Sequence, residues 1–122
     1  MRHGRAEPGG SASGRGRRVL AGDAAHPMLQ YLAQGACQAL EDAHVLGRQA
    51  AGHVGDGPAV DWDRALGDYQ AIRATRTARV QTTARMWGDL WHADGVGRVM
   101  RNELMRIRDM SSHRYTDWLY GA

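Results

Sequence analysis

The chain has 122 residues, so it holds at most one domain of modest size. Cys37 is the only cysteine, which excludes an internal disulfide and argues against a cysteine-based zinc site. The pI of 9.6 reflects residues 1–18, where five Arg face Glu7 alone, because the other residues carry eleven Arg against twelve acids. Charge alone therefore does not predict that the folded part binds nucleic acid.

Residues 1–16 are predicted to form a disordered arm, because they are rich in Gly, Ser and Arg and show no apolar periodicity. The arm lacks the apolar core of a signal peptide. No segment approaches the roughly 18 apolar residues that a membrane span needs. We therefore expect a cytoplasmic protein with no membrane contact, whose folded part covers residues 17–122.

The first predicted element of this folded part is a strand over residues 17–21, followed by a loop over residues 22–34. A helix is predicted from about Gly35 to Ala51, with Gly52 as its C-cap. Its small residues recur every three or four positions, so they share one face that can lie close against a sheet or a flat ring. These residues are Ala36, Ala39, Ala43, Gly47 and Ala50.

A second, long helix is predicted after the Gly55 to Pro58 linker and runs to about Trp91, with Asp61 as its N-cap. Residues 94–97 end it, and a last helix is predicted over about residues 99–109. The tail at residues 118–120 is aromatic and is expected to pack back on the body. The predicted inward residues are Trp62, Leu66, Tyr69 and Ile72 of the long helix and Met100, Leu104 and Ile107 of the last one.

The most informative segment is residues 22–43, GDAAHPMLQYLAQGACQALEDA. A Gly-Asp pair after the predicted strand places the carboxylate of Asp23 at a sheet edge, where it can accept hydrogen bonds from hydroxyl groups. The helix that opens at Gly35 presents free N–H groups and the positive end of its dipole. Such a helix start suits an electron-rich group of a ligand.

This segment resembles the second flavin-binding motif of the FAD-dependent aromatic-ring monooxygenases. Gln30 stands where the wider family commonly has Pro, and Gln occurs there in the branch that resembles 3-hydroxybenzoate 6-hydroxylase. The overall pattern is most similar to that branch and to salicylate hydroxylase-like proteins. The resemblance covers about residues 16–122. It is carried, in order and spacing, by Gly22-Asp23, Ala24-Ala25-His26, Pro27 to Leu32, Gly35, Glu41-Asp42 and Trp118 to Gly121.

The resemblance implies an oxidoreductase that uses FAD, NAD(P)H and dioxygen to hydroxylate a phenolic or aromatic acid through a flavin C4a-hydroperoxide. Gly22 and Asp23 are implied to bind the ribityl chain of FAD. Gly35, Ala36 and Cys37 are implied to set backbone N–H groups against the flavin ring. Gln30 is the candidate catalytic residue that orients the substrate. The resemblance implies no metal and allows a homodimer of the full-length parent.

The family also contains a strand, a GxGxxG turn and a helix for the ADP half of FAD, and no GxGxxG occurs in these 122 residues. The predicted fold is therefore mainly α, with one residual strand and three to four helices. It corresponds to the C-terminal part of an α/β, Rossmann-type FAD-binding monooxygenase. We expect this chain to be inactive by itself.

Simpler interpretations stay open for several of these residues. Asp23 also fits a turn residue that caps local N–H groups, and Gln30 a solvated loop residue. His26 is predicted to hold the loop in place, and Glu41-Asp42 to hold backbone or Arg groups. Arg73, Arg76 and Arg79 are predicted to form salt bridges or a solvated face. If they instead bind a partner protein or nucleic acid, the chain is a non-enzymatic helical module.

Overall fold

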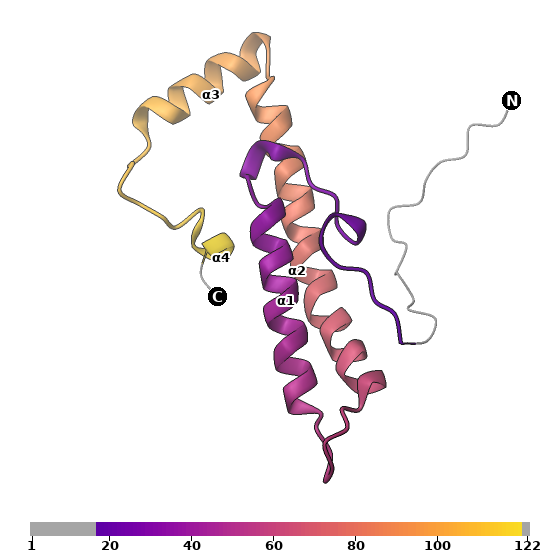
Figure 1. Cartoon of the computed structure of the whole chain (residues 1–122). Coiled ribbons are helices and arrows are strands. Elements are labelled where there is room, and N and C mark those ends of the chain that lie inside the picture. Colours follow the sequence, from indigo (N-terminus) through magenta and orange to yellow (C-terminus); the bar gives the residue numbers. More distant parts are fainter. Residues whose placement is uncertain (1–16, 121–122) are drawn as a thin grey trace, which may run out of the picture.

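The computed structural model describes residues 17–120, so the predicted arm lies outside the described residues. Two short 3-10 turns, η1 (Gly22–Ala24) and η2 (Gln30–Leu32), shape the loop before the first α-helix. The mainly α fold predicted from the sequence is confirmed. The α-helices, seen in Figure 1, are α1 (Gly35–Gly52), α2 (Trp62–Trp91), α3 (Gly95–Ile107) and α4 (Asp117–Tyr120).

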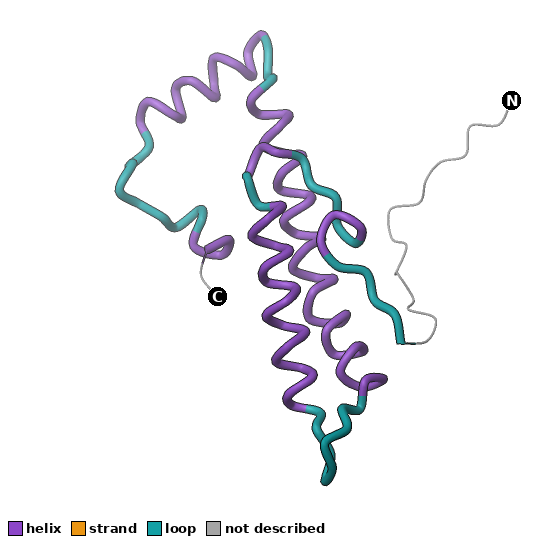
Figure 2. The backbone as a smooth tube through the Cα atoms, in the orientation of Figure 1, coloured by secondary structure: helices purple, strands orange, loops and turns teal. Residues whose placement is uncertain are grey.

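Residues 17–21 differ from the predicted strand, because they are extended but join no sheet in the part of the chain that the structure describes (Figure 2). A strand needs a neighbouring strand to pair its backbone groups. The one bridge among residues 17–120 joins Val54 to Val60 at the tip of the helical hairpin. The carbonyl of Leu20 instead accepts a hydrogen bond of 3.4 Å from the Tyr69 hydroxyl, which ties the segment to α2.

Helices α1 and α2 lie side by side as a hairpin, and α2 continues past the start of α1 (Figure 1). Asp61 is the N-cap of α2, as predicted, and its carboxylate accepts the backbone N–H of Arg64 at 3.2 Å. The 30 residues of α2 give it a length of about 45 Å. The extra length of α2 supports the loop over residues 22–34, which packs beside it.

The buried face of α2 shares Tyr69 with the predicted apolar stripe but differs from it elsewhere. Trp62 and Ile72 are 38% and 47% exposed. The face that meets α1 keeps Tyr69 but leaves out Trp62 and Ile72. It includes a buried arginine instead, because Arg73 pairs there with the acids of α1. The residues of this face are Ala65, Tyr69, Arg73, Thr77, Val80, Ala84 and Gly88.

Helix α3 corrects two predictions. Residues 94–97 start this helix instead of separating it from α2, since Asp94 caps the N–H of Gly95 at 2.7 Å. The predicted inward side chains are exposed by 68% at Met100, 57% at Leu104 and 76% at Ile107. The reason is that α3 leads away from the hairpin (Figure 1). Its apolar face therefore meets no other described element along these three residues.

The tail returns to the hairpin, as predicted. Leu119 in α4 is 4% exposed, and the carbonyls of Trp118 and Leu119 accept hydrogen bonds of 3.1 and 3.0 Å from Arg76. The guanidinium of Arg79 lies 4.0 Å from the centre of the Trp118 ring. Tyr120 remains exposed. Among the described helices, none is long and apolar enough to cross a membrane.

Candidate functional site

The turn at Gly22-Asp23 lies against the start of α1. Gly22 adopts a φ of +57°, a left-handed conformation that glycine tolerates without steric cost. Asp23 follows and is exposed. A Cβ atom added at Gly35 would lie 3.8 Å from Asp23 Oδ1. Apart from its own helix and its neighbours in the chain, no other described atom would lie within 4 Å of it. The structure therefore brings Asp23 and Gly35 together.

The N-terminus of α1 carries free donors. The first N–H groups of any α-helix lack an intrahelical partner. In α1 the side chain of the N-cap residue, Gln34, does not cap them either. Ala36 and the free thiol of Cys37 are exposed in this turn. A negative charge placed here gains about 0.3–1 kcal/mol, and up to ~2 kcal/mol when partly buried. A carboxylate and a donor-rich helix end thus share one exposed surface.

Gln30 lies apart from this pair, at the start of η2, and is exposed. Its turn is fixed by Tyr31, whose ring packs on Gly88 of α2 and meets His92 edge-on at 5.6 Å. The hydrogen bonds and ion pairs of residues 17–120 do not join Gln30 to Asp23 or Gly35; the carbonyl of Gln30 instead accepts the N–H of Ala33 at 2.9 Å. The turn ends at Ala33, whose φ of +52° costs a non-glycine residue about 1 kcal/mol. The surrounding packing holds this loop in a defined conformation.

A hollow of about 250 Å³ lies under the same loop. Two of its lining residues are joined, since Gln81 of α2 donates a hydrogen bond of 2.9 Å to the carbonyl of Pro27. The loop is therefore held on its α2 side at Pro27 and at Tyr31. The lining residues are Pro27, Met28, Leu29, Gln81 and Arg85.

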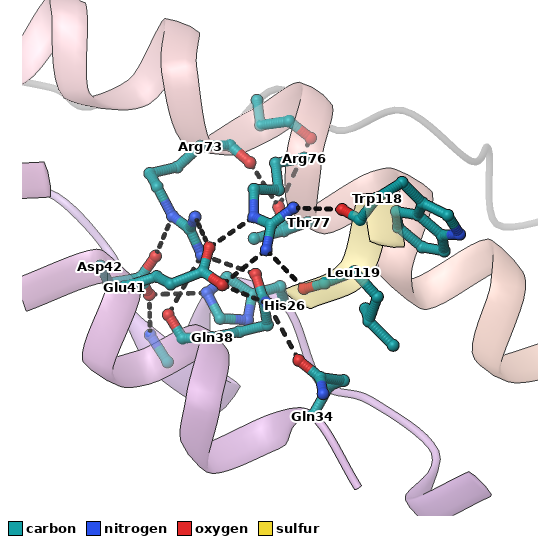
Figure 3. Close-up of polar contacts among 12 residues, drawn as sticks. His26, Gln34, Gln38, Glu41, Asp42, Arg73, Arg76, Thr77, Trp118 and Leu119 are labelled. Atoms are coloured by element: carbon teal, nitrogen blue, oxygen red, sulfur yellow. Dashed lines mark hydrogen bonds and ion pairs between the residues drawn. The ribbon is translucent and has the colours of Figure 1, made fainter. Parts of the chain in front are cut away.

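Behind the turn, the carboxylate of Asp42 is 1% exposed and gathers three donors. Oδ2 accepts the Gly22 N–H at 2.7 Å and faces His26 Nε2 at 2.6 Å, while Oδ1 accepts Arg73 Nε at 2.7 Å. Figure 3 shows these side chains converging from the loop, α1 and α2. Burial pushes the pKa of Asp42 upward, but the bonds from Gly22, Arg73 and His26 outweigh it and hold the pKa below its ordinary value.

Glu41 forms the second half of this cluster. Both its oxygens bind Arg76, at 2.5 and 2.7 Å, and Oε2 also accepts Arg73 Nη1 at 2.6 Å. The hydrogen bond from Arg76 leads the causes that lower the pKa of Glu41 to about 2, against the opposing effect of burial. The prediction that these arginines form salt bridges is confirmed for Arg73 and Arg76. Their guanidinium groups are thus engaged within the chain.

His26 holds the loop, as predicted. It is 3% exposed, and its contact with Asp42 assigns the ring proton to Nε2 in the neutral form. Nδ1 is buried and has no hydrogen-bond partner among the described residues. Since the ring is enclosed, it is not placed to reach a substrate. No group of three His, Cys, Asp or Glu side chains within residues 17–120 is arranged to hold a metal ion.

Gln38 is the residue of the cluster that escaped the sequence analysis, and the depth at which its partner Arg73 is buried was not expected either. Gln38 is fully buried and donates to Gln34 and Glu41 at 3.3 and 3.0 Å. Arg73 is 4% exposed and donates to the Gln38 carbonyl and to its Oε1. A signal was present, because the positions of Gln34, Gln38 and Glu41 form a polar stripe at helical spacing.

Comparison with known proteins finds no matching family model but clear relatives. The chain is 49% identical over 109 residues to 3-hydroxybenzoate 6-hydroxylase 2 of Aquipseudomonas alcaligenes, covering 87% of this chain and 32% of that protein. It is 41% identical to 3-amino-4-hydroxybenzoate 2-monooxygenase of Streptomyces cremeus, covering 87% and 25%. It is 34% identical to an FAD-dependent monooxygenase of Beauveria bassiana, covering 84% and 26%. The chain thus spans a quarter to a third of the length of these relatives.

Proposed function

The chain belongs by sequence to the family of hydroxybenzoate hydroxylases and related monooxygenases, and we propose that it forms the part of such an enzyme that faces the flavin and ribityl groups of FAD. The observation that carries the proposal is the approach of Asp23 to the open N-terminus of α1. The name of the Beauveria relative, an FAD-dependent monooxygenase, supports the choice of cofactor.

The donor set fits this cofactor. An ionised carboxylate accepts charge-assisted hydrogen bonds from hydroxyl groups such as those of a ribityl chain. The first N–H groups of α1, at Gly35, Ala36 and Cys37, can donate to the carbonyl edge of a flat ring, and the helix dipole favours negative charge there. Gly35 has no side chain to block the ring. When bound, the flavin would supply the oxygen-transfer chemistry, while these residues hold and orient it.

The substrate assignment rests on the relatives. The names of two of them specify a hydroxybenzoate and an amino-hydroxybenzoate, so we assign a phenolic aromatic acid and dioxygen as co-substrates. Gln30 is exposed on the loop between Asp23 and Gly35, where its amide can donate to a phenolate or carboxylate. NAD(P)H as reductant, the hydroxylation step itself, a cytoplasmic location and a homodimeric parent are parts of the same proposal.

Substitution of Asp23 tests the cofactor site. The matching stretch of the Aquipseudomonas relative is replaced by this chain from Arg17 onward, and bound flavin is measured by absorbance and by fluorescence titration. Asp23→Ala is expected to weaken flavin binding about ten- to a hundredfold, since a hydrogen bond to a charged group contributes ~1.5–3 kcal/mol. Asp89→Ala, an exposed carboxylate on α2, serves as the control and should leave binding unchanged. Equal flavin affinity in both variants, with normal circular dichroism, would refute the assignment of Asp23.

Substitution of Gln30 tests the substrate side in the same chimera. Gln30→Ala is expected to lower hydroxylated product per NAD(P)H consumed and to raise hydrogen peroxide, because a misplaced ring leaves the activated oxygen without its acceptor. A displacement of about 1 Å can cost on the order of a hundredfold in rate. Flavin binding should stay near that of the parent chimera. Unchanged coupling and unchanged substrate affinity would show that Gln30 is a solvated loop residue.

A further inference from the structure

The buried charges behind the turn are not used by the proposed contacts to flavin. Asp42 and Arg73 are 1% and 4% exposed, and removing two charges from water is costly. Well-packed apolar side chains often hold two helices together equally well or better. Stability alone therefore explains this ion pair poorly, and its hydrogen bonds indicate what else it does.

The hydrogen bonds of Asp42 connect the ion pair to the turn that carries Asp23. Asp42 Oδ2 binds the N–H of Gly22 on one side of Asp23 and the ring of His26 on the other. Asp42 lies two helical turns beyond Gly35 in the same helix. One carboxylate thus fixes the turn to the helix whose N-terminus Asp23 approaches.

Arg73 fixes that carboxylate in turn. Its Nε donates to Asp42 Oδ1, Nη1 to Glu41, and Nη2 to both oxygens of Gln38, so every nitrogen of the guanidinium is used within the cluster (Figure 3). With Oδ1 held by Arg73, Oδ2 points at the turn. A lysine would keep the positive charge but could not reproduce this planar fork of donors.

We propose that Arg73 is a positioning residue for the flavin-facing turn, acting through Asp42 on the Gly22 N–H and thereby on Asp23. The inference rests on the proposed function for the ligand, but its structural step is independent of any ligand. Arg73 lies 31 residues after Asp42 in the sequence. Its contact with Asp42 therefore links α2 to the geometry of the cofactor site.

The test uses the full 122-residue chain labelled with ¹⁵N. In Arg73→Met/Asp42→Leu both charges are replaced by apolar side chains, so the hairpin is expected to remain helical with a cooperative melt. Hydrogen exchange at the Gly22 amide should accelerate about ten- to a hundredfold, the factor that a charge-assisted hydrogen bond represents. Arg73→Lys, which keeps the charge, should give a smaller acceleration of the same sign. It serves as the second variant if the double variant unfolds.

Arg76→Gln is the matched control, because it cuts the Glu41 pair and the tail contacts on the same face of α2 but touches nothing in the turn. It should lower the melting temperature and leave exchange at Gly22 unchanged. Gly22 exchange that stays at the wild-type rate in a folded Arg73→Met/Asp42→Leu chain, or in Arg73→Lys, overturns the proposal. Equal acceleration at Gly22 in Arg76→Gln also overturns it, because the effect would then be general loosening.

FMN at millimolar concentration, which carries the same ring and ribityl chain as FAD, separates this inference from the proposed function. In the wild-type chain it should shift the amide signals of Gly35, Ala36 and Cys37, and these shifts should weaken in the double variant. An absence of shifts in the wild-type chain counts against the flavin site. The exchange at Gly22 still decides the role of Arg73.

Discussion

At the scale of single residues, the position of the loop depends on one close approach that leaves no room for a side chain. A Cβ atom added at Gly88 would lie 2.6 Å from Cε2 of Tyr31, a distance at which atoms overlap. Tyr31 anchors η2, and η2 begins with Gln30. The absence of a side chain at Gly88 therefore determines how closely the loop with Gln30 lies against α2.

Gly88→Ala is expected to destabilise the chain by about 1–3 kcal/mol, the usual cost of overpacking, because the Tyr31 ring must move. Gly67→Ala is the matched control in the same helix, since a Cβ there meets nothing within 4 Å. The control should stabilise the helix by roughly 0.5–1 kcal/mol. Urea unfolding followed by circular dichroism measures both. Equal effects in the two variants would mean that Tyr31 does not pack on Gly88.

At the scale of elements, the hairpin of α1 and α2 is held by charges at its centre. Buried apolar side chains there are few, and the ion pairs of Asp42 and Glu41 with Arg73 and Arg76 occupy the middle of the contact. An interface of this kind responds to pH more than an apolar one does.

The lowered pKa of Glu41 fixes the direction of that response. In the unfolded chain its carboxyl has a pKa near 4.5, and in the folded chain about 2. Its contribution is therefore present above pH 4.5 and is lost as the pH falls towards 2. It amounts to at most about 3 kcal/mol, and less because Glu41 is partly exposed to solvent.

Acid unfolding followed by circular dichroism tests this expectation. Glu41→Gln should flatten the loss of stability between pH 5 and 2, the window set by the two pKa values. Glu103→Gln removes an exposed pair with Arg106 on α3 and should change the profile little, because exposed pairs contribute little. Profiles that coincide for Glu41→Gln and the parent would contradict the role given to Glu41.

The sequence was sufficient to predict those elements that local chemistry decides. The starts of α1 and α2, the cap at Asp61 and the roles of His26 and Glu41-Asp42 follow from spacing, capping and an ordered motif. The buried face of α2 followed only at Tyr69, because the pairing of Arg73 with Asp42 is a long-range contact that helical periodicity does not report, and it leaves Trp62 exposed. The direction of α3 also depends on packing that helical periodicity does not report.

At the scale of the whole molecule, large apolar surfaces face solvent in the described residues. Val96, Val99, Met100, Leu104 and Ile107 of α3 are each more than half exposed. The small residues Ala36, Ala39, Ala43 and Gly47 of α1 are exposed as well, and this is the face predicted to lie against a sheet or a flat ring. Exposed apolar surfaces that lie together favour association with other molecules. We therefore expect poor solubility of the chain by itself.

The same reasoning predicts weak flavin binding by the separate chain. No GxGxxG turn is present to hold the pyrophosphate, so only the contacts at Asp23 and the α1 N-terminus contribute. Fluorescence quenching of FAD should show no stoichiometric complex at micromolar concentrations, with saturation only in the millimolar range. Tight stoichiometric binding by the 122 residues alone would contradict this expectation.

The central claim is that Asp23 and the N-terminus of α1 together receive the flavin end of FAD. The most direct measurement is a crystal structure of the chimera with FAD bound. We expect a ribityl hydroxyl within roughly 2.5–3.0 Å of the Asp23 carboxylate, and a flavin carbonyl facing the N–H groups of Gly35 to Cys37. Bound FAD with Asp23 turned to solvent and the α1 N-terminus remote from the ring would contradict it.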